Sequence, residues 1–114
     1  MITFFEVIFS EEAFEFLKGL GKKEQNKILF NIRKAQVEKD TALFKKLTDD
    51  IWEFRTLYNG IQYRLLAFWD KTSSMKTLVI CAHGFIKKSN KVPDREILKA
   101  MELKKYYFSI KEKK

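Results

Sequence analysis

The sequence has very few of the residues that form metal sites and covalent cross-links. Its 114 residues include one cysteine, Cys81, and one histidine, His83. A lone cysteine cannot form a disulfide within the chain, and one residue of each kind is too few for a Cys/His zinc site. Cys81 lies in an apolar stretch that disfavours a thiolate, so we expect it to fill the core. We therefore expect no metal and no cofactor, and a reducing cytoplasmic location.

Long hydrophobic runs are also absent. No stretch approaches the ~20 apolar residues that a membrane-spanning helix needs. The N-terminus has no basic segment followed by an apolar one, so we expect no secretory signal. Glycine and proline are scarce, at four and one residues, and no tract rich in them marks a linker. The length then predicts a single domain over residues 1–114.

Positive charge and aromatic residues are abundant instead. The formal net charge is +8, and 15% of the residues are aromatic, including eleven phenylalanines. The aromatic content is ample for a globular core. The charge favours a polyanionic partner, such as nucleic acid, an acidic protein or an anionic membrane surface. A basic surface that serves only solubility would explain the same charge.

Apolar periodicity predicts an α+β domain with the element order β-α-α-β-β-β-α. Three strand-like runs separated by turn residues form an antiparallel meander, and we expect the helices to cover one face of the sheet. The segment 38–50 is too irregular to assign. The expected elements are a strand over 2–9, helices over 10–19 and 22–37, strands over 51–57, 61–69 and 76–85, and a helix after Pro93.

The pair Asn59-Gly60 predicts the register of the first two meander strands. It favours a two-residue type I′ turn, because both central residues of that turn need positive φ. Counting outward from the turn places Arg55 directly opposite Arg64. Directly opposed residues share a face, so one face would be a core and the other a cationic platform. The core face would carry Trp52, Phe54, Thr56, Tyr63, Leu65 and Ala67, and the platform Glu53, Arg55, Gln62, Arg64, Leu66 and Phe68.

Two arginines opposite each other repel by a few tenths of a kcal/mol up to ~1 kcal/mol. A shared anion would relieve that repulsion, and guanidinium groups hold phosphate oxygens in a bidentate fork. The sequence therefore predicts an anion site at Arg55 and Arg64, on the side of the sheet away from the helices. The alternative is that Glu53, diagonal to Arg64, neutralises the pair on an exposed surface.

Further candidates lie near the platform in sequence. Lys45 and Lys46 precede the meander, while Lys87 and Lys88 follow it, and each could contact phosphate or be an ordinary solvated charge. His83 is the one side chain whose unperturbed pKa is near neutrality, although a single histidine beside Gly84 can equally be structural. Metal-free cleavage of RNA needs cations at the phosphate and groups that move protons, because the 2′-hydroxyl is the nucleophile.

Several motifs together resemble the RelE/HigB-like toxin superfamily, in its phage-derived HigB addiction-module branch. The resemblance covers most of the chain and is densest from Lys46 to Ala100. A Trp-Glu-x-Arg strand followed by Gly-Phe-x-Lys-Lys, with a proline five residues further on, is a specific combination. The matching segments are 46–47, 51–55, 63–65, 83–89, 92–93 and 96–97.

The resemblance implies a RelE-like fold and a toxin of a type II toxin–antitoxin pair. Such toxins cleave mRNA, usually in the ribosomal A site, and a co-expressed antitoxin, here expected to be a helix-turn-helix protein, silences them; a homodimer is also compatible. By matching position, Arg55, Arg64 and the Lys87/Lys88 pair are the basic residues at the scissile phosphate. We take Arg64, Arg55, Lys87 and His83 as catalytic candidates, and Lys46, Lys88, Arg55 and Arg64 as RNA contacts.

The proton-moving groups do not follow from the resemblance. Members typified by RelE carry lysines on the strand that holds Ile51 and Glu53 here. Family members often use a C-terminal aromatic residue or histidine, for which Tyr106 and Tyr107 are the nearest candidates. The alternatives to an RNA endonuclease are a non-catalytic homologue that acts as a binding or regulatory partner, and a gyrase inhibitor like the ParE relatives.

Overall fold

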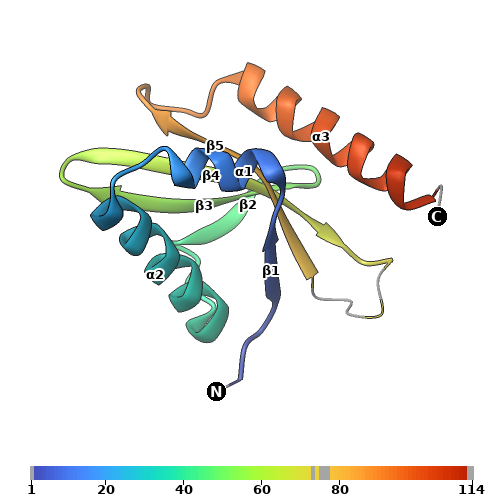
Figure 1. Ribbon diagram of the computed structural model, residues 1–114, viewed down its shortest axis with the longest axis horizontal. Helices are drawn as coiled ribbons and strands as arrows, with labels where there is room; N and C mark the ends of the chain where they lie inside the picture. Colours follow the sequence, from blue (N-terminus) through green and yellow to red (C-terminus); the bar gives the residue numbers. More distant parts are fainter. Residues whose placement is uncertain (1, 73, 75–77, 113–114) are drawn as a thin grey trace.

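The computed structural model describes residues 2–72, 74 and 78–112 and shows three helices and one five-stranded sheet (Figure 1). The α+β class and the RelE-like order of elements are confirmed, with one strand more than the sequence predicted. None of the helices in these residues combines the length and the apolar character needed to cross a membrane. The elements are β1 Glu6–Phe9, α1 Glu11–Lys18, α2 Lys22–Glu38, β2 Phe44–Thr48, β3 Ile51–Tyr58, β4 Ile61–Asp70, β5 Leu78–Lys87 and α3 Asp94–Glu112.

The strand order in the sheet is β1-β5-β4-β3-β2. Strands β2 to β5 are antiparallel neighbours, and β1 pairs in parallel with β5. The α1–α2 hairpin provides the crossover that parallel pairing requires. Strand β1 is shorter than the expected 2–9, because the chain before it bonds to α2 instead: the Phe4 amide donates to the Gln36 carbonyl, and the Gln36 side chain donates to the Phe5 carbonyl.

Strand β2 is the element that sequence reasoning missed. It pairs with β3 through the two-residue connection at 49–50. Only Phe44 of this strand is buried among the aromatic rings of the core, and the consecutive Lys45 and Lys46 interrupt any apolar alternation. Strand β5 begins at Leu78 and extends to Lys87, two residues beyond the expected end; expected strand positions 76 and 77, and part of the turn over 70–74, lie outside the described residues.

The turn at Asn59-Gly60 has the predicted conformation, with φ of 51° and 75°. Its consequence is also confirmed, because Tyr58 pairs with Ile61 and Arg55 pairs with Arg64 across β3 and β4. The two arginines therefore project from the same face of the sheet.

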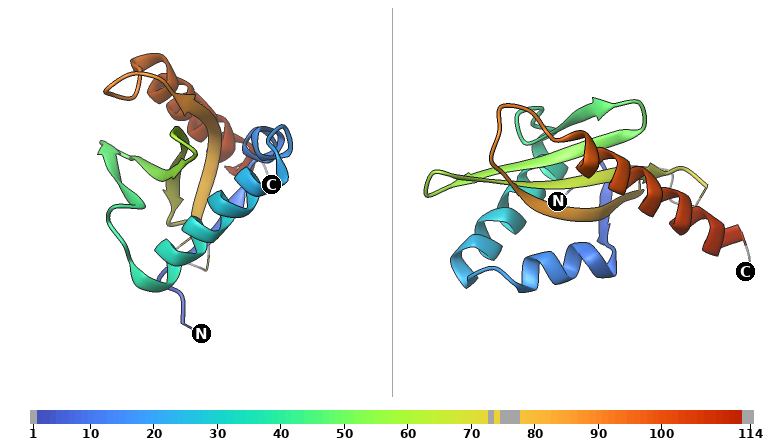
Figure 2. Two further views of the ribbon diagram at one scale, coloured as in Figure 1. Left: turned by 90° about the vertical axis from the view of Figure 1, so that its left-hand side faces the viewer. Right: turned by 90° about the horizontal axis from the view of Figure 1, so that it is seen from above.

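The expectation that helices cover only one face is wrong. Helices α1 and α2 pack on the predicted core face, around residues such as Phe54 and Leu65, but α3 packs on the opposite face over Leu66 and Phe68 (Figure 2). The molecule is therefore layered helix–sheet–helix, with a core on each side of the sheet. The predicted platform face is therefore partly core, around Leu66 and Phe68.

Helix α1 contacts β5 at two points. The Ser10 hydroxyl caps α1 by accepting from the Ala13 amide, and it donates to the Ala82 carbonyl of β5. Gly84 of β5 faces the Phe16 ring so closely that a Cβ there would lie 2.3 Å from Phe16 Cδ2. Helix α1 is therefore fixed against β5 by a cap and by a glycine that admits an aromatic ring.

Candidate functional site

Four cationic side chains project from the same face of the sheet. Arg55 of β3 is paired with Arg64 of β4, and Lys45 of β2 is paired with Glu53 of β3. Lys87 of β5 is paired with Gln62 of β4. Gln62 lies two residues before Arg64 and therefore points to the same face. Because paired residues share a face and the side chains alternate along a strand, three neighbouring strands and the edge strand each contribute one cation. We call Lys45, Arg55, Arg64 and Lys87, with the carboxylate of Glu53, the cationic cluster.

Glu53 lies between the two arginines. Its Oε1 is 3.6 Å from Arg55 Nε, and its Oε2 is 3.5 Å from Arg64 Nε. Glu53 is 3% exposed. Neither Glu53 Oε2 nor Arg64 Nε has a hydrogen-bond partner among the described residues. The carboxylate thus balances part of the positive charge, as the alternative interpretation had it, but inside the protein and through loose ion pairs.

Arg64 is buried, contrary to an exposed platform. Its residue exposure is 3%, its Nη2 donates to Gln62 Oε1 at 2.6 Å, and its Nη1 donates to the Tyr63 carbonyl at 3.3 Å. Burial lowers the pKa of the guanidinium, and Glu53 acts in the opposite direction. Phe85 lies directly opposite Arg64 on β5 and packs against the α3-side core. Arg64 is therefore held in one geometry, and Arg55, whose side chain is 34% exposed, is the accessible guanidinium.

Lys87 is half-buried, and its pKa is lowered from the ordinary value. Burial and the nearby positive charge of Arg64 lower its pKa, while Glu53 raises it and Arg55 and Lys45 contribute further lowering. The five members of the cationic cluster are therefore close enough for their charges to influence one another. A phosphate placed over them would be attracted by several charges at once.

On β2, Lys45 and not the predicted Lys46 lies on the face of the cationic cluster. Lys46 is paired with Trp52, whose ring packs on the α1–α2 core, so Lys46 points to the opposite face from Arg55 and Arg64. At its end of the sheet, Lys46 lines depressions with Trp52 on its own face and with Lys104 of α3, which reaches the same end from the other face. Lys45, the adjacent residue of the strand, points to the other face and belongs to the cationic cluster. Lys88 follows the last residue of β5 and is exposed, so the sheet assigns it to neither face.

His83 is placed as a structural residue. It is 1% exposed, and its Nε2 donates to the Glu96 carbonyl of α3 at 3.0 Å, which fixes the tautomer because a carbonyl can only accept. Its ring stacks on Phe85 with centroids 6.0 Å apart. Burial lowers its pKa below the ordinary value. The candidate histidine thus shares a face with Arg64 but is used to attach the start of α3.

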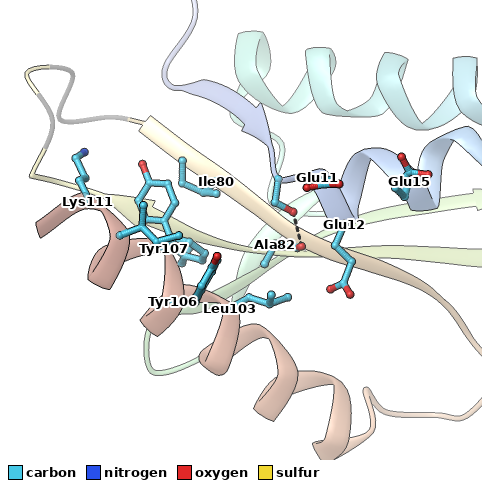
Figure 3. Close-up of a pocket in the computed structure, with 12 residues that line it drawn as sticks. Glu11, Glu12, Glu15, Ile80, Ala82, Leu103, Tyr106, Tyr107 and Lys111 are labelled. Atoms are coloured by element: carbon cyan, nitrogen blue, oxygen red, sulfur yellow. Dashed lines mark hydrogen bonds between the residues drawn. The ribbon is translucent and has the colours of Figure 1, made fainter. Parts of the chain in front are cut away.

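The C-terminal tyrosines are also away from the cluster. Tyr107 donates from its hydroxyl to Asp70 Oδ2 at 2.6 Å, and Lys111 bonds to the same oxygen. Burial and Asp70 raise the pKa of Tyr107 to about 12. Asp70 is the last residue of β4, six positions beyond Arg64, and Tyr106 points into a groove beside α3 (Figure 3). Neither phenol can reach a phosphate held by Arg55.

The cluster combines four cations with one carboxylate, an arrangement whose excess positive charge would attract an anion. Among residues 2–72, 74 and 78–112, no three His, Cys, Asp or Glu side chains are grouped as a metal site. Cys81 is buried, and burial raises the pKa of its thiol, in keeping with a core role. Lys45 is among the sequence candidates, but the predicted RNA contact is Lys46; strand assignment over 44–48 would have favoured Lys45 by parity with Glu53.

Comparison with known proteins gives one family and one fold. The profile of the family described as "Phage derived protein Gp49-like (DUF891)" matches residues 15–105. Among solved structures, a double arginine-to-alanine mutant of the E. coli toxin RelE in the free state is similar, with a TM-score of 0.52 and 15% identity. That match covers 79% of this chain and 86% of the RelE chain. No match was found among curated proteins.

Proposed function

This chain belongs to the phage-derived Gp49-like family, a RelE/HigB-type toxin family, and on that basis we propose that it is a toxin of a type II toxin–antitoxin system that cleaves mRNA on the ribosome. The observation that carries the proposal is the cationic cluster: Lys45, Arg55, Arg64 and Lys87 share one sheet face, where Lys45 is exposed, Arg55 and Lys87 are half-buried and Arg64 is buried. The family match and a cluster of cations that would attract phosphate support the same class of activity.

The proposed reaction uses the nucleophile that RNA itself supplies. The 2′-hydroxyl attacks the adjacent phosphorus, a P–O2′ bond forms, and the P–O5′ bond breaks, which leaves a 2′,3′-cyclic phosphate and a 5′-hydroxyl. The 2′-hydroxyl loses its proton to an acceptor, and the leaving 5′-oxygen gains one. No metal ion is needed in this scheme if cations stabilise the negative charge that accumulates on the phosphoryl oxygens.

The residues divide these tasks according to their exposure. Arg55 is the accessible guanidinium and would hold the phosphate, and Lys45 would fix the neighbouring part of the backbone. Arg64 is buried and bonded to Gln62, so it would act through charge from beneath the phosphate. Lys87, whose pKa is lowered, is the candidate proton donor for the 5′-oxygen. His83 and the C-terminal tyrosines are omitted because their bonds hold them elsewhere.

A test of this proposal is expression of the chain alone in bacteria, with mapping of new 5′ ends on cellular mRNA. The expected result is growth arrest with cuts that depend on translation. Arg55→Ala should reduce cleavage by about a hundredfold or more, the usual loss when one group that stabilises developing charge is removed. Arg33→Ala is the matched control, because Arg33 is an exposed arginine on α2, in the other helical layer. Unchanged cuts in Arg55→Ala would refute the site.

A non-catalytic binding role is the second candidate, and one observation favours it. The sequence names three side chains as candidates for moving protons, His83, Tyr106 and Tyr107. Two of them are engaged in bonds within the protein: His83 to Glu96 and Tyr107 to Asp70. A homologue that kept the cations but not the chemistry would bind ribosomes or RNA and leave mRNA uncut. RNA binding without new 5′ ends would establish this role, and DNA damage without mRNA cuts would indicate gyrase inhibition.

A further inference from the structure

A groove of about 860 Å³ lies between the start of α1 and the C-terminal half of α3 (Figure 3). No member of the cationic cluster lines it. Its floor is formed by Phe68, Ile80 and Ala82, which belong to the α3-side core. The groove is therefore a second surface, separate from the cationic cluster, whose exposed lining comes from its two helical walls.

The α3 wall of the groove is apolar and open to solvent. Tyr106 is 64% exposed and Ile110 is 40% exposed, and both line the groove. Large apolar side chains that gather at a hollow, with a polar rim, are characteristic of sites where another protein docks. Tyrosine in particular is enriched among the residues that dominate binding energy.

The α1 wall carries a charge opposite to that of the whole protein. Glu11, Glu12 and Glu15 line it in a chain whose net charge is +8. The dipole of α1 accounts for carboxylates in its first turn, but Glu15 lies one turn further along. Glu12 is within 3.3 Å of Lys99 Nζ, and Lys111 lines the far end of the groove. The rim beside the apolar floor remains acidic even after the Lys99 pair is counted.

We propose that this groove binds a helix of a partner protein that presents an apolar stripe edged by lysine or arginine. A helix suits a trough flanked by two helices, with apolar anchors in the floor and charges at the rim. The basic surface elsewhere repels such a helix, so its attraction is confined to the acidic wall. The inference rests on the proposed function only in taking that partner to be the silencing antitoxin; the groove and its charge do not depend on RNA cleavage.

The test uses two synthetic helical peptides with the same leucine stripe, one flanked by lysines and the other by glutamates. Binding to the full chain is measured by fluorescence anisotropy at low salt. We expect the lysine peptide to bind at least about tenfold more tightly than its twin, although the net charge of the protein predicts the reverse. Glu11→Lys with Glu15→Lys should abolish that preference, whereas Glu102→Lys, an exposed α3 carboxylate outside the groove, should preserve it.

The apolar wall of the groove is tested by a second pair of variants, one inside the groove and one outside it. Tyr106→Glu should weaken the lysine peptide about tenfold or more, and Leu98→Glu, at a comparably exposed α3 position outside the groove, should change it little. Equal binding of the two peptides, or insensitivity to Tyr106→Glu, would overturn the proposal. A chain that sediments as a dimer and becomes monomeric with Tyr106→Glu would overturn it in favour of a second copy. None of these outcomes depends on mRNA cleavage, so the two proposals fail separately.

Discussion

Replacing Glu53 with glutamine tests whether one buried carboxylate holds the cationic cluster together. Glu53→Gln keeps the size and shape of the side chain but removes its charge. Arg64, which is 3% exposed, would then be left without a counter-charge in the interior. Breaking one partner of a buried ion pair costs about 3–5 kcal/mol, because the remaining charge is desolvated and uncompensated. That is a large share of the roughly 5–15 kcal/mol that stabilises a typical domain.

The two arginines provide an internal comparison. Both contact the same carboxylate, at 3.6 Å for Arg55 and 3.5 Å for Arg64, so distance does not distinguish them. Burial does, because the Arg55 side chain is 34% exposed and the Arg64 side chain 3%. A partly exposed pair contributes at most about 1 kcal/mol, so Arg55→Ala should be much milder than Glu53→Gln.

The assay is urea unfolding followed by tryptophan fluorescence, since Trp52 and Trp69 pack in the core next to β2. The matched rescue is the double variant Glu53→Leu with Arg64→Met, which replaces the pair by apolar side chains and should recover most of the lost stability. The reasoning is refuted if Glu53→Gln unfolds within about 0.5 kcal/mol of the parent, or if Arg55→Ala is as destabilising as Glu53→Gln.

Three further predictions concern the scaffold. Gly84→Ala should destabilise by about 1–3 kcal/mol, because the new Cβ would overlap the Phe16 ring; thermal unfolding at an unchanged midpoint would contradict the close approach. Ser10→Ala should cost about 1 kcal/mol through loss of the α1 cap, and urea titration that shows no loss would remove the cap from the account. Burial alone would raise the pKa of Asp70, but bonds from Lys111, Tyr107 and Thr72 outweigh it and hold that pKa below its ordinary value; the charged form therefore stabilises the fold above the unfolded-state pKa of about 3.9, and this contribution is lost as the pH falls below that value. The stability difference between the parent and Asp70→Asn should accordingly shrink between about pH 5 and pH 2, and a difference that stays constant would show that Asp70 is not a charged anchor.

The register of β3 and β4 could be predicted because it depends on two adjacent residues. Asn59-Gly60 specifies the turn, and the turn specifies that Arg55 opposes Arg64. The sheet face on which α3 packs was harder to predict, because no single turn or motif specifies it. Leu66 and Phe68 already marked the second face as apolar, and that signal, read together with the apolar positions of β5, could have indicated that a helix covers it.

The role of His83 could not be predicted, because it depends on a contact with Glu96, thirteen positions away on another element. The choice between Lys45 and Lys46 failed for a different reason. Two adjacent lysines must lie on opposite faces of a strand. The segment shows no alternation from which a strand could be recognised, so the sequence did not indicate which of the two lysines shares a face with Glu53. Tertiary packing, rather than local propensity, decided both residues.

The most direct measurement compares Lys45→Ala with Lys46→Ala in binding to single-stranded RNA over a range of salt concentrations. Both lysines are exposed neighbours on β2, and they point to opposite faces of the sheet. Lys45→Ala should weaken binding and lower the slope of log affinity against log salt by about 0.7, the amount for one lost phosphate contact, whereas Lys46→Ala should leave both unchanged. Equal losses in the two variants, or a loss confined to Lys46→Ala, would contradict a phosphate site on the Arg55–Arg64 face.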